Sequence, residues 1–319
     1  MNFTQLLNII ITLFLLMVCG YICRRLKIID SVSSKNLSKL IISVGQPMMI
    51  IGALNNAEYS KENLQLALHT TVISFAMHLL MGLAAFLICR RMKDLDRAKL
   101  MEFGLVFANC GFIGFPIMDS ILGDKYGAGM GSFMGAFYVI AFHIFLWTWG
   151  IVILSRGRDD IKLTPKKALL NYGTVPCAIG VALYLLKPVF TVPQSVGTFF
   201  SYLGNLCTPI SVLITGALLA TLSLRSMLTC KKIYLMSALK LLVFPAVVCV
   251  LAKLVGLPEL YITLCTVMAG LPCAATITML AELHDIEPGF ASQEVGMTSL
   301  LTTATLPCVL LFAQWVISL

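Results

Sequence analysis

Charged residues are scarce in this chain: Asp, Glu, Lys and Arg make up 12% of the 319 residues, whereas 59% are hydrophobic. The mean hydropathy is correspondingly high, at +0.92. A soluble globule of this size needs more polar side chains to cover its surface, so the composition excludes one. We predict a polytopic membrane protein of the all-α class.

Motifs for catalysis, metal binding and nucleotide binding are also lacking. The eleven cysteines form no Cys-x-x-Cys pair, and most of them lie inside apolar runs, which is typical of free buried thiols. No zinc-binding pattern, Ser-His-Asp arrangement or phosphate-binding loop occurs in the sequence. We therefore expect no enzymatic activity, no metal and no cofactor.

Long apolar runs are abundant. About 20 apolar residues span the hydrocarbon core of a bilayer, whereas a strand of a membrane β-barrel needs about ten residues of alternating polarity. The runs here are continuous and longer, which favours helices. We predict ten transmembrane helices, at residues 4–22, 37–54, 64–89, 100–122, 131–154, 169–187, 197–222, 233–254, 259–282 and 291–317.

The basic residues follow an alternating pattern. Of the 23 Lys and Arg residues, 18 lie in the loops after odd-numbered segments, four lie in the loops after even-numbered segments, and Lys240 lies inside the eighth segment. Basic residues near helix ends remain in the cytoplasm. The pattern predicts a plasma or inner membrane protein with both termini on the non-cytoplasmic side. It also accounts for the net charge of +8 without a nucleic-acid partner.

The chain divides into two halves with matching features. We predict five segments in residues 1–154, a basic cytoplasmic linker at 155–168, and five segments in 169–319. Each half has an odd number of spans, so the second half enters the membrane from the opposite side and the two form inverted repeats. The matching features are Pro47 with Pro209, Pro116 with Pro272, and Gly52-Ala53-Leu54 with Gly216-Ala217-Leu218.

Two stretches place glycine and proline in the middle of a membrane-spanning run. They are Phe107–Pro116 in the fourth segment and Met268–Thr276 in the ninth. An unpaired backbone group in lipid costs several kcal/mol, so a broken helix persists only inside protein or beside a watery cavity. Such breaks in both halves are typical of a transporter whose site lies near the midplane. Because proline removes an N–H, we expect the helices to break at Pro116 and Pro272.

The chain also resembles a known family. Asn109–Pro116 continuing to Gly123, Ala269–Ala275 and Ser299–Pro307 resemble the auxin efflux carrier family, which includes plant auxin exporters and bacterial permeases for malonate or malate. Plant members usually carry a long loop between the halves, so this chain looks like the short microbial type. The resemblance implies the inverted-repeat fold of bile-acid and sodium-antiporter carriers. Segments four and nine would cross in a transport domain of segments 3–5 and 8–10, and segments 1, 2, 6 and 7 would form a scaffold that often dimerises.

The expected crossing supplies the candidate substrate site. Half-helices beginning there would direct N-termini at a carboxylate, although the C-termini of the preceding half-helices could bind a cation instead. Asn109 is a candidate ligand for the substrate, and the resemblance also implies this role. Alternatively, its side chain bonds to unpaired carbonyls of the broken helix. Thr276 offers a hydroxyl to the substrate or bonds to its own helix. The remaining members of the candidate set are Gly111, Gly114 and Gly270, which allow close backbone approach, with Pro116 and Pro272.

Further polar residues lie in the scaffold segments and inside other spans. Gln46 before Pro47 and Thr208 before Pro209 either face the substrate path or cap distorted backbone. Ionisable residues in spans are candidates for ion coupling. Lys240 either extends to the cytoplasmic surface or pairs with Glu294. Glu294 itself, His78, His143 and Asp119 are candidates for proton relay, although a histidine inside a span can instead be a hydrogen-bonded packing group.

These features predict a secondary active transporter that moves a small organic anion, such as a mono- or dicarboxylate, by alternating access. Because no nucleotide motif is present, coupling to H⁺ or Na⁺ or the membrane potential would supply the energy. We expect the lipid bilayer, the anion and a second copy of the chain as partners. The alternative is a membrane-embedded carboxylate sensor that signals through a partner.

Overall fold

The computed structural model describes residues 3–158, 161, 170–222 and 230–319. Most of the predicted linker 155–168, residue 169 and Arg225 lie outside them. Every element in the described part of the chain is helical, and the single β-bridge is isolated. The all-α class is confirmed.

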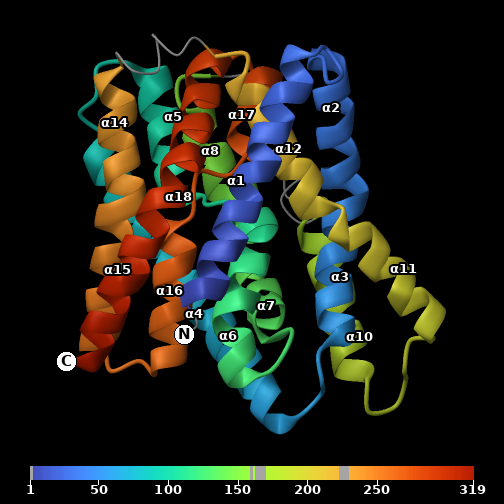
Figure 1. Cartoon of the computed structure of the whole chain (residues 1–319). Helices are drawn as coiled ribbons and strands as arrows, with labels where there is room; N and C mark the ends of the chain where they lie inside the picture. The colour runs from blue at the N-terminus through green and yellow to red at the C-terminus, as the bar shows by residue number, and fades with distance from the viewer. Residues whose placement is uncertain (1–2, 159–160, 162–169, 223–229) are drawn as a thin grey trace.

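Helices occupy all ten predicted segments (Figure 1). In the first half they are α1 (Phe3–Arg25), α2 (Ser31–Leu40), α3 (Gln46–Asn56), α4 (Lys61–Cys89), α5 (Leu95–Val106), α6 (Phe115–Tyr126), α7 (Met130–Phe145) and α8 (Ile151–Ser155). In the second half they are α10 (Thr174–Leu186), α11 (Gln194–Asn205), α12 (Cys207–Leu219), α14 (Lys231–Ala238), α15 (Phe244–Leu254), α16 (Glu259–Gly270), α17 (Thr276–Leu283) and α18 (Pro288–Ser318).

Seven helical stretches of the described chain are long and apolar enough to cross a membrane. Three shorter apolar helices are Cys110–Gly123, Thr174–Leu186 and Glu259–Gly270. Two of these three belong to the predicted fourth and ninth segments, where a break divides the helix. The seven long stretches are Leu7–Arg25, Ser31–Asn56, Lys61–Cys89, Met130–Ser155, Gln194–Leu219, Lys231–Leu254 and Pro288–Ser318.

The described helices contain four short π-helical turns, and three of them explain how prolines fit into these helices. The four turns are η1 (Ile41–Gly45), η2 (Cys110–Gly114), η3 (Leu146–Gly150) and η4 (Leu239–Val243). Pro47, Pro116 and Pro245 each occupy the second residue of the α-helix that follows η1, η2 or η4. Proline lacks the N–H and its ring clashes with the carbonyl one turn back. A wider π turn at that place lets the helix continue without breaking.

The helices pack in two bundles. In the first bundle, α1 packs along α12, and α3 packs against α10 and α11. Glycines bring α1 and α12 into backbone contact: a Cβ on Gly20 would lie 2.0 Å from the carbonyl oxygen of Leu213, and one on Gly216 would lie 1.9 Å from that of Met17. We call α1–α3 and α10–α12 bundle A.

The second bundle contains the two broken helices. Here α4 packs on α5 and α7, α6 on α7, and α16 on α15 and α18. Gly131 and Gly135 of α7 face α6, because a Cβ on the first would lie 2.1 Å from the backbone of Met118 and one on the second 2.7 Å from the Phe115 ring. We call α4–α8 and α14–α18 bundle B.

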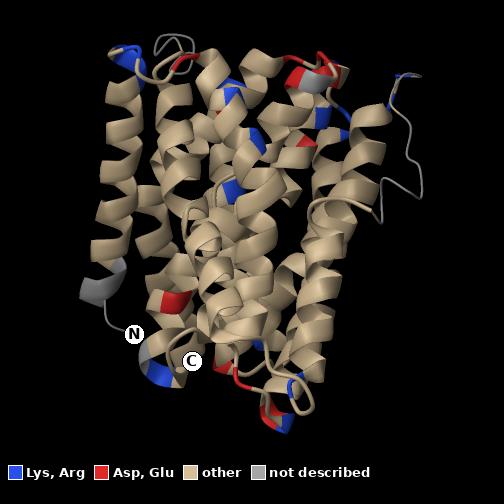
Figure 2. Ribbon diagram, turned by 90° about the vertical axis from the view of Figure 1, so that its right-hand side faces the viewer, with Lys and Arg blue, Asp and Glu red and all other residues tan. Residues whose placement is uncertain are grey.

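Charged side chains gather at the two ends of the molecule, and few lie between them (Figure 2). The N- and C-termini lie at the same end (Figure 1). At the ends, Asp30, Ser60 and Asp94 cap α2, α4 and α5 with their side chains. Lys125 donates to Glu259 at 2.7 Å, and this hydrogen bond raises the pKa of Lys125.

Candidate functional site: two broken helices and an adjacent cavity

The two helix breaks meet inside bundle B. Helix α5 ends at Val106 before η2 starts at Cys110, and α16 ends at Gly270 before α17 starts at Thr276. The extended residues between them pair antiparallel, as the Ala108–Cys273 bridge. The Asn109 N–H donates to the Pro272 carbonyl at 2.8 Å, and the Ala274 N–H donates to the Phe107 carbonyl at 2.9 Å. Each break thus satisfies backbone groups of the other, as buried backbone requires.

The position of the first break differs from the prediction. Pro272 lies in the second break, but Pro116 lies in the first turn of α6 and outside the crossing. The prediction that Pro116 builds the crossing is therefore wrong. The π turn η2 accommodates Pro116 without a break in the helix. The helix breaks earlier because the Asn109 N–H donates to the Pro272 carbonyl instead of to a carbonyl of its own helix.

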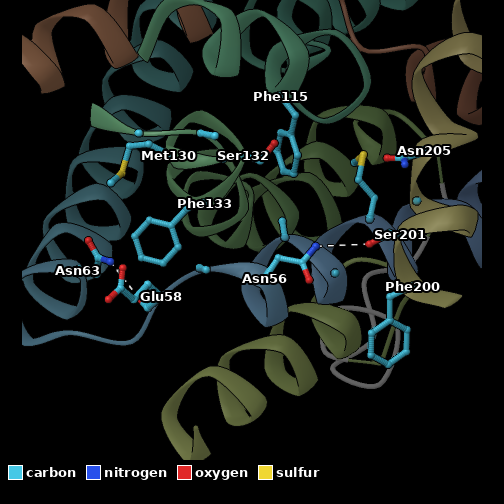
Figure 3. A pocket seen from close by; sticks show the side chains of 18 of the residues that line it. Asn56, Glu58, Asn63, Phe115, Met130, Ser132, Phe133, Phe200, Ser201 and Asn205 are labelled. Atoms are coloured by element: carbon cyan, nitrogen blue, oxygen red, sulfur yellow. Dashed lines mark hydrogen bonds between the residues drawn. The ribbon is translucent and has the colours of Figure 1, made fainter. Parts of the chain in front are cut away.

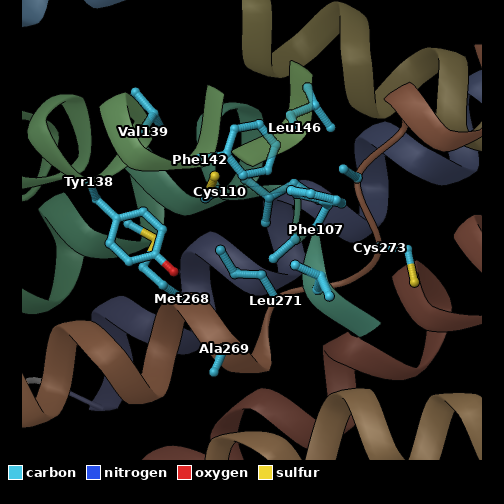
Figure 4. Packing of buried hydrophobic residues seen from close by; sticks show 14 of the residues in the cluster. Phe107, Cys110, Tyr138, Val139, Phe142, Leu146, Met268, Ala269, Leu271 and Cys273 are labelled. Carbon is cyan, nitrogen blue, oxygen red and sulfur yellow. The ribbon is translucent and has the colours of Figure 1, made fainter. Parts of the chain in front are cut away.

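Apolar side chains surround the crossing. Phe107, Leu271 and Cys273 have no exposed surface, and Figure 4 shows Phe107 and Phe142 on one side of Leu271 with Met268 on the other. The Phe107 ring lies 5.8 Å from that of Phe142, edge to face. This packing excludes water, so polar groups at the crossing must be satisfied by protein or by a ligand.

Two side chains support the crossing from other helices. Lys240 of η4 donates to the Leu105 carbonyl at 3.0 Å, which is the carbonyl that the Asn109 N–H would have reached in a continuous helix. Thr298 of α18 accepts the Cys273 N–H at 3.1 Å and donates to its own helix at the Glu294 carbonyl, 2.6 Å away. Lys240 therefore places a cation at the C-terminal end of α5, where the helix dipole favours positive charge.

Neither expectation for Lys240 holds. Its side chain is fully buried, so it does not reach the surface. It also forms no pair with Glu294, because both carboxylate oxygens of Glu294 are buried without a hydrogen-bond partner among the described residues. The freed carbonyl of Leu105 competes for the ammonium, and the long lysine side chain reaches it.

The other predicted crossing residues lie around the breaks. The side chain of Asn109 is 5% exposed and makes no hydrogen bond with the described residues. A Cβ on Gly114 would lie 3.0 Å from the Leu271 side chain, so η2 packs closely on the second break. Gly111 and Gly270 make ordinary contacts with Met49 and Pro245. Thr276 begins α17, and its buried hydroxyl has no partner in the described part of the chain.

The polar residues before the prolines of bundle A both reach bundle B. The Gln46 amide nitrogen lies 3.0 Å from Nε2 of His143 on α7, and both side chains are buried. Thr208 donates to the Phe112 carbonyl at 2.7 Å. Pro116 has no N–H to offer that carbonyl, so the Thr208 hydroxyl replaces it. Pro47 and Pro209 lie beside these residues, near the starts of α3 and α12.

We expect Thr208→Val to destabilise the protein by about 1–3 kcal/mol, because the buried Phe112 carbonyl would lose its donor. Thermal unfolding of the purified protein measures the effect. Thr215→Val is the matched control, since Thr215 lies on the same helix and bonds only to its own helix at Ser211. Equal losses in the two variants would contradict the role given to Thr208.

Asp119 has a local partner. One of its carboxylate oxygens accepts the Ser132 N–H at 2.7 Å, and the other accepts the Ser132 hydroxyl. Ser132 lies in the first turn of α7. Asp119 therefore caps the N-terminus of α7, where negative charge is favourable.

A cavity of about 530 Å³ lies between the two bundles. Its walls come from α3 and α11 on one side and from α6, α7 and the loop between them on the other (Figure 3). The cavity lies next to η2. Two of its lining residues show this, because Phe115 directly follows η2 and Met49 contacts Gly111 of η2. Among the described residues that line the cavity there is no Lys or Arg, and Glu58 is the one carboxylate. Aromatic rings and polar groups share the lining, namely Phe115, Phe133, Phe200, Tyr126, Asn56, Asn63, Asn205, Ser132 and Ser201.

Sequence reasoning missed the residues of this cavity. Asn56 and Ser201 form a 3.4 Å hydrogen bond within the wall made by α3 and α11 (Figure 3), and Asn205 follows Ser201 by one helical turn. The available signal was polar side chains at helical spacing in apolar runs. The pairing itself joins residues 145 positions apart, which no local pattern indicates.

Two comparisons with known proteins identify the class of this protein. The family described as membrane transport protein matches residues 6–310. An uncharacterized transporter of Methanothermobacter thermautotrophicus is 23% identical over 303 residues, which cover 93% of this chain and 95% of that relative. Because the family match covers nearly the whole chain, the chain belongs to the membrane transport protein family, the auxin efflux carrier family that its motifs resemble.

Proposed function

We propose that the protein is a secondary active transporter of small organic anions, such as mono- or dicarboxylates. The observation that carries the proposal is the bond from Lys240 to the Leu105 carbonyl. Two half-helices begin at the crossing and two end there, so either an anion or a cation could bind. Lys240 already supplies a cation to the C-terminal end of α5. The N-termini of η2 and α17 then favour an anion.

The cavity supports a path for that anion. It ends beside η2, next to the first break, and its walls offer amides and hydroxyls but no lysine or arginine. Aromatic rings in the same walls suit a substrate with an apolar body. We propose that a carboxylate enters through the cavity and reaches Asn109 and the half-helix N-termini at the crossing.

The division into two bundles supports alternating access. We propose that bundle A is a scaffold and that bundle B, with the crossing, moves against it. We propose ten membrane spans in two inverted repeats, which is supported by two equal separations: Gly52 and Gly216 are 164 residues apart, as are Val106 and Gly270 at the ends of α5 and α16. Pro47 and Pro209 are close to this separation, at 162 residues. Pro116 and Pro272 do not correspond to each other at a separation of 164 residues. This agrees with their different positions relative to the two breaks.

The proposal extends to the setting of the protein. The alternating basic loops support a location in the plasma or inner membrane with both termini outside the cytoplasm. We also propose that the exposed apolar surface of bundle A pairs with a second copy of the chain. The energy would come from an ion gradient or the membrane potential. Chemical cross-linking in native membranes tests the dimer.

Reconstitution into liposomes tests the transport function. We expect uptake of labelled malonate, malate or an indole carboxylate above that of protein-free liposomes, measured with and without Na⁺. Flux that requires Na⁺ would identify the coupling ion. Binding of these carboxylates without flux would contradict the proposal and favour a sensor.

A further inference from the structure

Glu294 is a carboxyl group without a partner in the interior of bundle B. It lies on α18, has no exposed surface, and neither of its side-chain oxygens has a hydrogen-bond partner among the described residues. Its Oε2 atom would lie 3.5 Å from a Cβ on Gly104 of α5. An isolated carboxylate is very unfavourable in such surroundings, whereas the protonated acid is tolerated.

The groups around Glu294 do not neutralise it. Among the described residues, the titratable side chains that interact with it are the thiols of Cys89 at the end of α4, Cys230 before α14 and Cys273 in the second break. The nearby cations have other partners: Lys240 donates to Leu105, and Arg156 pairs with Glu102 of α5 at 2.5 Å. The other helices that pack on α18, which are α1, α12, α15, α16 and α17, bring no described titratable group to it.

Glu294 differs in this respect from the other ionisable candidates. Lys240 supports the crossing, His143 is bonded to Gln46, and Asp119 caps α7. Each of these three has a polar partner in the structure, and Nδ1 of His78 lies 2.7 Å from the Ser74 carbonyl oxygen. Nδ1 of His143 has no partner among the described residues, but Glu294 is the one candidate whose carboxyl group makes no hydrogen bond with them.

Glu294 is also connected to the crossing. Its carbonyl accepts the hydroxyl of Thr298, and that same hydroxyl accepts the Cys273 N–H in the second break. A charge on Glu294 would therefore act one helical turn from the residue that holds the break. The carboxyl group also lies close to the second break, because a Cβ on Gly104 would lie 3.5 Å from Glu294 Oε2 and 3.1 Å from Cys273 Sγ.

We propose that Glu294 is the proton-binding site that couples substrate movement to the pH gradient. Its carboxylate takes up one proton when the site faces the more acidic side, and the neutral acid crosses with the anion and releases the proton on the other side. The proposal rests on the transport function proposed above. It assigns H⁺ as the coupling ion, leaves Lys240 as the cation at the crossing, and gives His143 and Asp119 structural roles.

The test compares Glu294→Gln with the wild type in liposomes. We expect an imposed pH gradient to drive accumulation of labelled malonate by the wild type, and entrapped pH dye to report proton entry with it. In Glu294→Gln the pH-driven component should be lost while exchange of internal for external malonate persists. pH-driven accumulation in Glu294→Gln, or malonate entry without proton entry in the wild type, would overturn the proposal.

A second measurement does not depend on transport. Infrared difference spectra between high and low pH should contain a protonated carboxylic acid band that is absent in Glu294→Gln. Glu102→Gln is the matched control, because Glu102 is buried but paired with Arg156, and it should retain the band. If the wild type moves no carboxylate but shows the Glu294 band, the transport function fails and proton binding stands. If the wild type lacks the band, the proposal of proton binding at Glu294 is wrong. This outcome is read from the wild type alone, so it applies even if Glu294→Gln does not fold.

Discussion

We expect Lys240→Met to lower anion transport by up to about 30-fold, while the protein remains folded. The buried ammonium is the cation at the crossing, and a charge at a helix end contributes up to about 2 kcal/mol, which is up to about 30-fold at 1.4 kcal/mol per factor of ten. The effect on folding should be smaller, because removing a buried charge offsets the loss of a donor to Leu105. Initial rates of labelled malonate uptake at equal protein content measure the change.

Lys253→Met is the matched control for this prediction. Lys253 also donates to a helix carbonyl, that of Ile317 near the end of α18, at 3.0 Å. It lies away from the crossing and is partly exposed. We expect near wild-type transport for this control. Equal transport by Lys240→Met and the wild type would show that the charge at Leu105 does not assist the anion.

The helical architecture could be predicted from the sequence because its cause is local. Apolar runs long enough to cross a membrane fixed the helical class, and glycine and proline indicated the two interruptions. The second break lies where Pro272 indicated. The first was displaced because proline can be absorbed by a π turn, as η2 does before Pro116, and nothing in the local pattern distinguishes a π turn from a break.

The contacts that make the candidate site are long-range, which is why the sequence did not indicate them. Lys240 bonds to a carbonyl 135 residues earlier, and Thr208 to one 96 residues earlier. Both bonds exist because a backbone carbonyl lost its helical partner, at Leu105 through the break and at Phe112 through Pro116. Which carbonyls lose partners depends on where the helix breaks, and which side chain replaces them depends on packing between distant segments.

The second large effect is expected for Asn109→Ala, which should reduce uptake of labelled carboxylate about 10–100-fold at low substrate concentration. The side-chain amide of Asn109 lies directly before η2. It makes no hydrogen bond with the described residues, so its NH₂ group is free to donate to the substrate. A bond to a carboxylate contributes about 1.5–3 kcal/mol. Thermal stability should change little, because no protein group loses a partner.

Thr303→Ala is the control for Asn109→Ala. Its hydroxyl bonds to its own helix at Leu300, so transport should remain near the wild-type rate. Asn109→Asp adds a negative charge where we expect the anion, and it should reduce uptake at least as strongly as alanine does. A loss of thermal stability in Asn109→Ala with unchanged substrate dependence of uptake would instead mean that the asparagine satisfies the broken helix. The affinity of the anion would then come from the half-helix N-termini and from the hydroxyl of Thr276 at the start of α17, which has no partner among the described residues.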